Sequence, residues 1–206
     1  MEITRTASAG VLLKLNGVSF LLDGVSKYLF PYEKTPESIK SEIMKNPPDV
    51  MAFTHYHEDH YDKDFVNSYK EDTLRSVYGP ELSDFLQTGK TRLYAVPTRH
   101  IGKSDISHVS FVISGEKCVW FMGDASPLNL RKLENMPKPD VLIAPFAYFN
   151  TPSSFEAAKR TGAKNFVIVH MPEEENDEYN LWRDVKNVIG EEKGVFLMRI
   201  GETIIL

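Results

Sequence analysis

Thr54-His55-Tyr56-His57-Glu58-Asp59-His60 contains three of the six histidines of this chain and a carboxylate within six consecutive residues. The stretch directly follows Asp49-Val50-Met51-Ala52-Phe53, an apolar run that predicts a short buried strand. Histidine and aspartate are costly to bury without partners, so packing does not explain their density here. Beyond the strand end, His55 and His57 point to the same side because they are two residues apart, and the last two residues follow where the chain turns away.

The four polar side chains of this stretch predict a metal site. Four ligands this close in sequence would strain a single ion. Two ions, each completed by ligands from elsewhere, fit the two directions in which the segment points. The alternative is a polar loop that caps the next helix through Asp62.

Other polar residues also follow short apolar runs. His100, Asp124 and His170 each end or closely follow a strand-like run, as His55 does. Residues at the ends of adjacent strands gather at one edge of a sheet, where open α/β folds place their sites, so these four groups can converge. Taken singly, the two later histidines could equally be capping or hydrogen-bonding groups, and the aspartate after Gly123 could be a turn residue.

The stretch at 54–60 has the HxHxDH pattern of the metallo-β-lactamase superfamily, and the resemblance extends along most of the chain. In that family a third histidine, a bridging aspartate and a last histidine come from later strand ends. The matching segments here are Val96-Pro97-Thr98-Arg99-His100, Phe121-Met122-Gly123-Asp124 and Val167-Ile168-Val169-His170. The resemblance implies one ion held by His55, His57 and His100, a second held by Asp59, His60 and His170, and Asp124 as the bridge between them.

Further candidate residues lie outside this set. His108 is expected mid-strand in a structural role, with support of a ligand or contact with substrate as the alternative. Cys118 is the only cysteine, so it has no internal disulfide partner, and its apolar surroundings predict a buried small hydrophobe rather than a reactive thiol. Tyr148 and Phe149 follow a predicted strand, and they either line the pocket or pack against the next helix.

Composition and charge narrow the class of protein. A chain of 206 residues that is 42% hydrophobic predicts one globular domain over residues 1–206. Neither a secretory signal nor an apolar run of about 18 residues is present, so we expect a cytoplasmic protein without a membrane segment. The net charge of −5 disfavours long nucleic acids as partners and leaves a small-molecule substrate. The acidic run Glu173-Glu174-Glu175-Asn176-Asp177-Glu178 predicts a solvated helix start.

The order of apolar runs and turn signals predicts alternating strands and helices. Asn16-Gly17 and Ser114-Gly115 each predict a hairpin, so two hairpin-led halves are followed by strand-helix alternation. This pattern indicates two sheets packed face to face with helices outside, and the resemblance implies the same α/β (α+β) fold, a four-layer αββα sandwich. The expected helices cover 36–46, 62–70, 80–87, 128–134, 152–160 and 177–189, the first capped by Thr35, and a last hairpin across Gly201 joins 195–198 to 203–205.

Hydrolysis is the chemistry that such a site predicts. Two divalent ions about 3.5–4 Å apart can share a water, lower its pKa toward neutrality and orient a bridging hydroxide, while one ion polarises the substrate oxygen. Asp59 could accept a hydrogen bond from that hydroxide and then carry a proton to the leaving group, which makes it the expected catalytic residue. Histidine and carboxylate ligands suit zinc, the metal we expect, and also manganese or iron.

Departures from other members narrow the reaction. Zinc-dependent β-lactamases often have cysteine where this chain has Asp124, and the flavin-linked di-iron oxygen reductases have glutamate in place of His57. The early hairpin with Leu22-Asp23 at its exit, and Leu142-Ile143-Ala144-Pro145-Phe146 before the last histidine, most resemble the small metal-dependent hydrolases related to ascorbate-6-phosphate lactonase. We expect a dinuclear hydrolase of a small ester, lactone or phosphodiester. The alternatives are a metal-binding or sensor protein without turnover, or a nuclease of the same superfamily, and the oligomeric state is left open.

Overall fold

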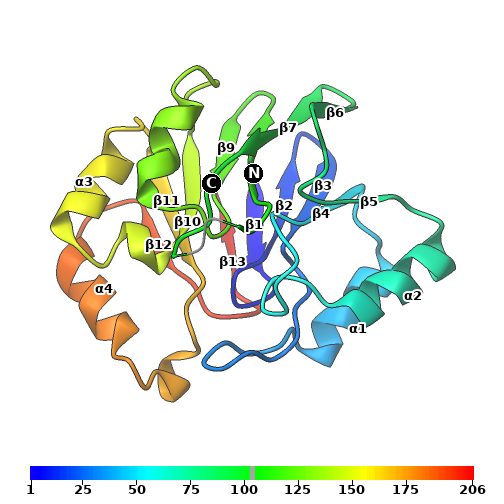
Figure 1. Ribbon diagram of the computed structural model, residues 1–206, viewed down its shortest axis with the longest axis horizontal. Coiled ribbons are helices and arrows are strands. Elements are labelled where there is room, and N and C mark those ends of the chain that lie inside the picture. The colour runs from blue at the N-terminus through cyan, green and yellow to red at the C-terminus, as the bar shows by residue number, and fades with distance from the viewer. Residues whose placement is uncertain (103–104) are drawn as a thin grey trace.

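The computed structural model describes residues 1–102 and 105–206, and its strands form two sheets (Figure 1). The first sheet has the order β13-β1-β2-β3-β4-β5, and the second has the order β12-β11-β10-β9-β8-β7-β6. The strands of the first sheet are β1 (Glu2–Arg5), β2 (Val11–Leu15), β3 (Val18–Leu22), β4 (Val50–Ala52), β5 (Val77–Tyr78) and β13 (Thr203–Ile205). Those of the second are β6 (Phe85–Thr88), β7 (Thr91–Pro97), β8 (Val109–Ser114), β9 (Cys118–Phe121), β10 (Val141–Pro145), β11 (Asn165–Val169) and β12 (Val195–Leu197).

Both predicted hairpins are present, and they begin the same pattern in each sheet. β2 and β3 pair antiparallel across Asn16 and Gly17, whose φ angles of 53° and 77° suit the tight turn that this dipeptide favours. β8 and β9 pair antiparallel in the same way in the second sheet. In each sheet the antiparallel strands are followed by parallel ones, β4 and β5 in the first and β10 to β12 in the second.

The core between the sheets follows from the two-residue period of a strand. In β10, Val141 and Ile143 face the first sheet, whereas Leu142 and Ala144 join the cluster on the outer face of the second. β11 alternates in the same sense. Because both faces of these strands are buried, their sequences are continuous apolar runs rather than alternating ones.

Helices cover the outer face of each sheet, which confirms the four-layer αββα sandwich (Figure 1). α1 (Glu37–Lys45) and α2 (Lys63–Thr73) lie on the first sheet, and their side chains share a buried cluster with Leu21 and Met51. α3 (Pro152–Lys159), α4 (Leu181–Ile189) and the 3-10 helix η1 (Pro127–Leu133) lie on the second. Shorter 3-10 helices are η2 (Phe146–Tyr148) and η3 (Glu174–Asn176). None of the helices within 1–102 and 105–206 is long and apolar enough to cross a membrane.

The predicted C-terminal hairpin is wrong. β12 lies in the second sheet, parallel to β11, and β13 lies in the first, antiparallel to β1. Arg5 holds the crossing segment in place, because its buried guanidinium donates to the carbonyl of Met198 at 2.6 Å and its own carbonyl accepts from Gly201 N at 2.7 Å. Long-range pairing with the N-terminal strand therefore overrides the local turn.

The helix predicted at 80–87 is also wrong, since part of it forms β6. Phe85 pairs with Tyr94 across a hairpin that turns at Gly89, and Leu86 packs against the core between the sheets. Thr35 does not cap α1 as expected. Its hydroxyl accepts a hydrogen bond from Ser26 N at 2.9 Å, and Pro36 occupies the N-cap position without a side-chain hydrogen bond. The last helix begins at 181 instead of 177.

Candidate metal centre

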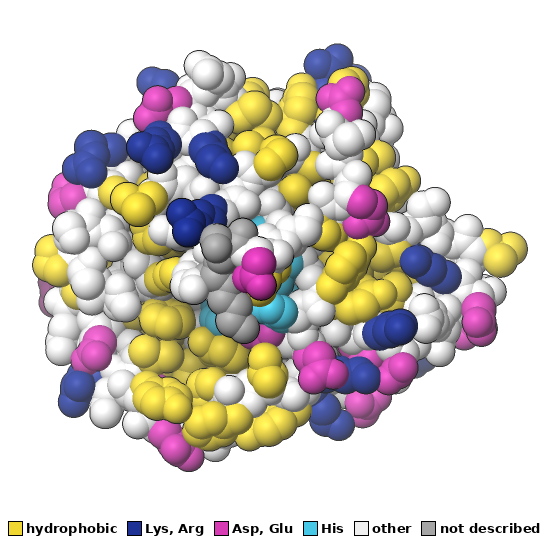
Figure 2. Space-filling view, in the orientation of Figure 1, with side chains coloured by type: hydrophobic (Ala, Val, Ile, Leu, Met, Phe, Trp, Pro, Cys, Tyr) yellow, Lys and Arg dark blue, Asp and Glu magenta, His cyan; other side chains and the backbone are white. Residues whose placement is uncertain are grey.

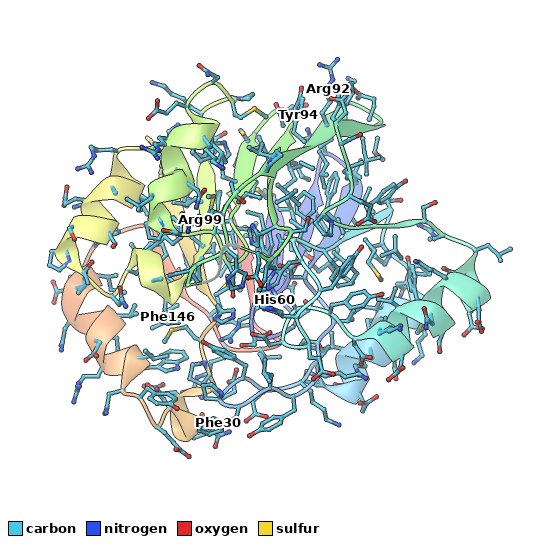
Figure 3. All side chains as sticks on the ribbon, viewed as in Figure 1. Phe30, His60, Arg92, Tyr94, Arg99 and Phe146 are labelled. Carbon is cyan, nitrogen blue, oxygen red and sulfur yellow. The ribbon has the colours of Figure 1, made fainter. Side chains whose placement is uncertain are left out.

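The polar residues that follow the strands meet at one edge of the sandwich. His55 follows β4, His100 follows β7, Asp124 follows β9 and His170 follows β11, so both sheets contribute. Figure 2 shows histidine side chains in the middle of one face, and Figure 3 places His60 there in front of the strands. The expected convergence of strand-end residues is therefore present in the structure.

His55, His57 and His100 form a first group of candidate ligands. One nitrogen from each ring lies within 4.8 Å of the others. His55 Nε2 is 3.1 Å from His57 Nδ1, and the ring of His100 lies 4.9 and 5.0 Å, centroid to centroid, from the two other rings. His55 and His100 are buried, whereas His57 is half-buried.

Asp59, His60 and His170 form a second group with the same spacing, each offering an atom within 4.8 Å of the others. His170 Nε2 lies 3.1 Å from Asp59 Oδ2. All three residues are buried, and His60 is fully enclosed. We call these two sets the three-histidine group and the carboxylate group.

Asp124 lies between the two groups. Its Oδ1 is 3.3 Å from His60 Nε2, and its Oδ2 is 3.5 Å from His100 Nε2 and 3.4 Å from His170 Nε2. One carboxylate thus reaches ligands of both groups. All seven residues expected from the sequence therefore lie in one cluster.

Hydrogen bonds on the outer side of the rings fix which nitrogen faces the cluster. His60 Nδ1 donates to Asp23 Oδ2 at 2.9 Å, and His100 Nδ1 donates to the carbonyl of Ile101 at 2.6 Å. The Thr54 hydroxyl donates to Asp23 Oδ2 at 2.6 Å, so it accepts from His55 Nδ1 at 3.0 Å. In each of these histidines the Nε2 lone pair is left to point at the cluster, as metal-binding imidazoles require.

Asp23 is a functional residue that the sequence interpretation missed. Its buried carboxylate accepts from Thr54 N at 2.7 Å, from the Thr54 hydroxyl and from His60 Nδ1. It could itself be grouped with His55 and His60 as a ligand. Because its oxygens already accept these three hydrogen bonds, it holds the ligands in place instead. The available signal was its position directly after β3, the same strand-end position as the other site residues.

Gly123 allows Asp124 to enter the cluster. It has a φ of 52°, and a Cβ built on it would lie 2.5 Å from the Thr54 hydroxyl oxygen. A side chain here would be strained and would displace the threonine that orients His55 and binds Asp23.

His108 supports the backbone of Asp124. Its Nε2 accepts from Asp124 N at 3.0 Å, so Nδ1 carries the proton and donates to the Thr98 hydroxyl at 2.8 Å. The Thr98 hydroxyl in turn donates to Ser110 Oγ at 3.0 Å. Ser110 Oγ donates to the carbonyl of Met122, also at 3.0 Å. Burial lowers the pKa of His108 to about 3, which keeps the ring neutral and able to accept this bond. The expected mid-strand position is wrong, since His108 lies directly before β8. Its bond to the backbone of Asp124 fits the supporting role, the alternative in the sequence interpretation.

Two histidines of the three-histidine group, His55 and His57, are held neutral. Burial lowers the pKa of His55 far below its usual range, and the neighbouring His60 lowers it further. Burial also lowers the pKa of His57, with His100 as the next cause. Neutral imidazoles are the form that binds metal, so both rings are ready to act as ligands near neutral pH.

The carboxylates of the cluster are held ionised. Burial opposes the charge of Asp124, but His170 and His60 outweigh it and hold the pKa of this carboxyl well below its usual range. Burial likewise opposes the charge of Asp59, yet the hydrogen bond from His170 and the charge of His60 lower its pKa. For His60 burial lowers the pKa, but the carboxylates of Asp124 and Asp23 raise it well above its usual range. The carboxylates thus favour a positive charge at this point, and a metal ion at Nε2 would supply it in place of a proton.

Unpaired buried atoms test whether these residues fit a metal ion. Asp59 Oδ1, His60 Nε2, His100 Nε2 and Asp124 Oδ1 have no hydrogen-bond partner within 1–102 and 105–206. Buried polar atoms in native proteins nearly always have a partner. Nitrogen and carboxylate donors of this kind suit a divalent transition ion, so the residues present fit such an ion.

Aromatic residues near the cluster were only partly foreseen. Tyr32, which the sequence interpretation missed, lies with its ring 4.1 Å from that of His170, centroid to centroid. Tyr148 and Phe149 are fully buried in the outer core of the second sheet, which decides for packing over pocket lining. Cys118 is buried as expected, and burial raises the pKa of its thiol to about 12.

Comparisons with known proteins give the family and the fold. A family model described as "Beta-lactamase superfamily domain" matches residues 2–172. No curated protein matches the chain. Among solved structures, a possible metal-dependent hydrolase from Veillonella parvula is 16% identical, with 100% of this chain and 99% of the other covered and a TM-score of 0.74.

Two further solved structures are similar in fold. An isothiocyanate hydrolase from Delia radicum gut bacteria is 15% identical over 100% of this chain and 99% of the other, with a TM-score of 0.68. CmlA, a diiron beta-hydroxylase from Streptomyces venezuelae, is 14% identical over 100% of this chain and 54% of the other, with a TM-score of 0.65. At these identities the likeness shows a shared fold alone.

Proposed function

Because this chain belongs to the metallo-β-lactamase superfamily, we propose that it is a metal-dependent hydrolase with a two-ion centre that cleaves a small ester, lactone or phosphodiester. The observation that carries the proposal is the position of Asp124, within 3.3–3.5 Å of nitrogens from both ligand groups. A carboxylate placed in this way suits two neighbouring ions better than one. His55, His57 and His100 would hold the first, and Asp59, His60 and His170 the second.

Two ions held there would lower the pKa of a shared water toward neutrality and polarise an oxygen of the substrate. The chain supplies the proton transfer. Asp59 is ionised, its Oδ2 is engaged by His170, and its buried Oδ1 has no hydrogen-bond partner among the described residues. Oδ1 is therefore the atom that would take a proton from the nucleophile and pass it to the leaving group.

The names of the similar structures support the reaction class and leave the metal open. Two of the three are called hydrolases, whereas the third is a diiron enzyme with a different reaction. The donor set of histidine nitrogen and carboxylate oxygen suits zinc, our first proposal, and also manganese or iron. We further propose that the chain acts as a single domain in the cytoplasm on a small molecule, since its net charge of −5 disfavours long nucleic acids.

Metal analysis combined with an activity screen in the same metal state tests the proposal. We expect two equivalents of metal in the purified protein and turnover of at least one class among lactones, thioesters and phosphodiesters. Treatment with a chelator should abolish this turnover, and restored metal should recover it. Two equivalents of metal with no turnover of any class would indicate a metal-binding protein instead.

A further inference from the structure

A hollow of about 510 Å³ opens beside the metal centre, on the side of His100. Its volume is in the range of small-molecule sites, roughly 300–1,000 Å³. Three cationic side chains line it and no carboxylate does. The residues that matter here are Arg99, His100, Asn129, Arg131 and Lys132.

The three cations of this hollow form no ion pair within the part of the chain that the structure describes. Within residues 1–102 and 105–206, none of Arg99, Arg131 and Lys132 has a nitrogen within 4.0 Å of a carboxylate oxygen. Figure 2 shows several Lys and Arg side chains above and to the left of the histidines, and Figure 3 labels Arg99 on that side of His60.

The two segments that carry the cations are tied together. The buried side chain of Asn129 accepts from Arg99 N at 2.9 Å and donates to the Arg99 carbonyl, also at 2.9 Å. That carbonyl also accepts from Ser126 N at 3.1 Å. Lys132 Nζ lies 3.3 Å from the Pro97 carbonyl, at the end of β7. The segments that carry the three cations are therefore held together in the absence of a ligand, which lowers the cost of bringing the cations around one.

The hollow and the metal centre share a wall. His100, a candidate ligand, lines the hollow, and its segment pairs with the one that carries Asp124, since Ile101 N donates to the Asp124 carbonyl at 2.8 Å. A separate hollow of about 390 Å³ is lined by Phe30, Glu33 and further acidic residues, and it has the opposite charge. Of these two hollows, only the one lined by Arg99, Arg131 and Lys132 attracts an anionic group.

We propose that the hollow binds an anionic oxyacid group, phosphate or carboxylate, carried by the part of the substrate that is not cleaved. Guanidinium groups bind such oxyanions through paired, charge-assisted hydrogen bonds, and Arg99 and Arg131 have their side chains available for this. The inference rests on the proposed hydrolase function, because it makes the hollow a subsite of the same centre. It specifies the substrate as an ester, lactone or phosphodiester that carries a second, anionic group.

Anion binding to the metal-loaded protein tests the hollow without requiring turnover. Isothermal titration calorimetry with inorganic phosphate in one arm and glutarate in the other compares wild type with the double variant Arg99→Gln/Arg131→Gln. We expect wild type to bind at least one of the two, and the double variant to bind it about 10–100-fold more weakly with its metal content unchanged. Binding confined to one arm identifies the group as phosphate or as carboxylate.

A matched control separates the hollow from general charge effects. Arg92→Gln removes the same charge at the far end of β7 (Figure 3), and we expect it to bind the anions as wild type does. Equal binding by wild type and the double variant, or no binding by wild type in either arm, would overturn the inference.

Turnover distinguishes the two proposals. For any substrate that is cleaved, the double variant should lower kcat/KM about 10–100-fold when the substrate carries the anionic group and leave a neutral analogue unchanged. Anion binding that depends on the two arginines, together with no hydrolysis of any class, would remove the proposed reaction and leave the anion site. If wild type and the double variant hydrolyse the anionic substrate with the same kcat/KM, the proposed reaction stands and the anion site is removed.

Discussion

The two ligand groups of the centre lie side by side but are built differently. The three-histidine group has no carboxylate, and His57 is half-buried. The carboxylate group is buried throughout, and Asp23 holds His60 from behind at 2.9 Å. Each group takes residues from both sheets, since 55–60 follow β4 of the first sheet and His100 and His170 follow strands of the second.

This difference separates two tasks. The three-histidine group consists of imidazole rings alone, held mainly by short-range bonds, such as the one from His100 to the adjacent Ile101 carbonyl. The carboxylate group contains Asp59, whose negative charge would take up a proton in the proposed reaction. We therefore expect changes in the first group to act on metal content and stability, and changes in the second to act mainly on turnover.

Replacement of Asp59 by asparagine should have the largest effect. Asparagine is nearly the same size and can still offer an oxygen, but it carries no negative charge and cannot hold the proton. We expect the fold and the ion of the three-histidine group to be kept, and the turnover number at saturating metal to fall by about 10²–10⁴. Steady-state kinetics with metal titration checks this, and near-native turnover would leave Asp59 as a replaceable ligand only.

The variant His57→Ala should act on the other group. Removal of one of three rings should lower metal content and thermal stability together, because ions that bind only the folded state stabilise it, by about 2.7 kcal/mol at 100 times the dissociation constant. Elemental analysis and a thermal melt with and without chelator measure both. Lost activity with full metal content would contradict its role as a ligand.

Asp23→Asn tests the support behind the carboxylate group. The amide nitrogen would face hydrogens of Thr54 or His60, so His60 would lose its fixed orientation. We expect the second ion to bind about 10–100-fold more weakly, with a smaller change at the first. Asp49→Asn is the matched control, since that surface carboxylate also accepts backbone and hydroxyl bonds, from Ser19. Equal weakening by both substitutions would argue against a specific role for Asp23.

His108→Ala should have the smallest effect and is the histidine control for His57→Ala. Its ring contacts the backbone of Asp124, not the candidate ligand atoms, so both metal equivalents should be retained. Activity should fall by at most about 10–100-fold, since Asp124 loses a positioning bond. Loss of a metal equivalent in this variant would show that the ligand set proposed here is incorrect.

Local spacing accounts for what could be predicted. The four polar residues at 55–60 lie in one cluster because they follow a single strand end, and the apolar runs of β10 and β11 are long enough to mark strands buried on both faces. The Asn16-Gly17 turn is likewise a property of two adjacent residues. The fold does not test the resemblance of this chain to the hydrolases related to ascorbate-6-phosphate lactonase, so that relation stays a prediction.

Contacts between distant segments account for what was missed. The segment 203–205 pairs with β1 and not with its neighbour β12, because Arg5 and the N-terminal strand offer it partners that no local pattern reveals. Residues 85–88 form a strand because β7 lies beside them, although their sequence also suits a helix.

Strand periodicity and turn signals are local properties, so the sequence by itself determined two sheets with helices outside and a cluster of polar residues at one strand end. The resemblance to the metallo-β-lactamase superfamily implied the αββα sandwich and the full set of seven candidate ligands. Only the tertiary structure decided that Asp124 lies 3.3–3.5 Å from nitrogens of both groups, that Asp23 and His108 support the ligands, and that Arg99, Arg131 and Lys132 surround one hollow. These features depend on which side chains are brought within a few ångströms by packing the two sheets. Sequence separation carries no information about such distances.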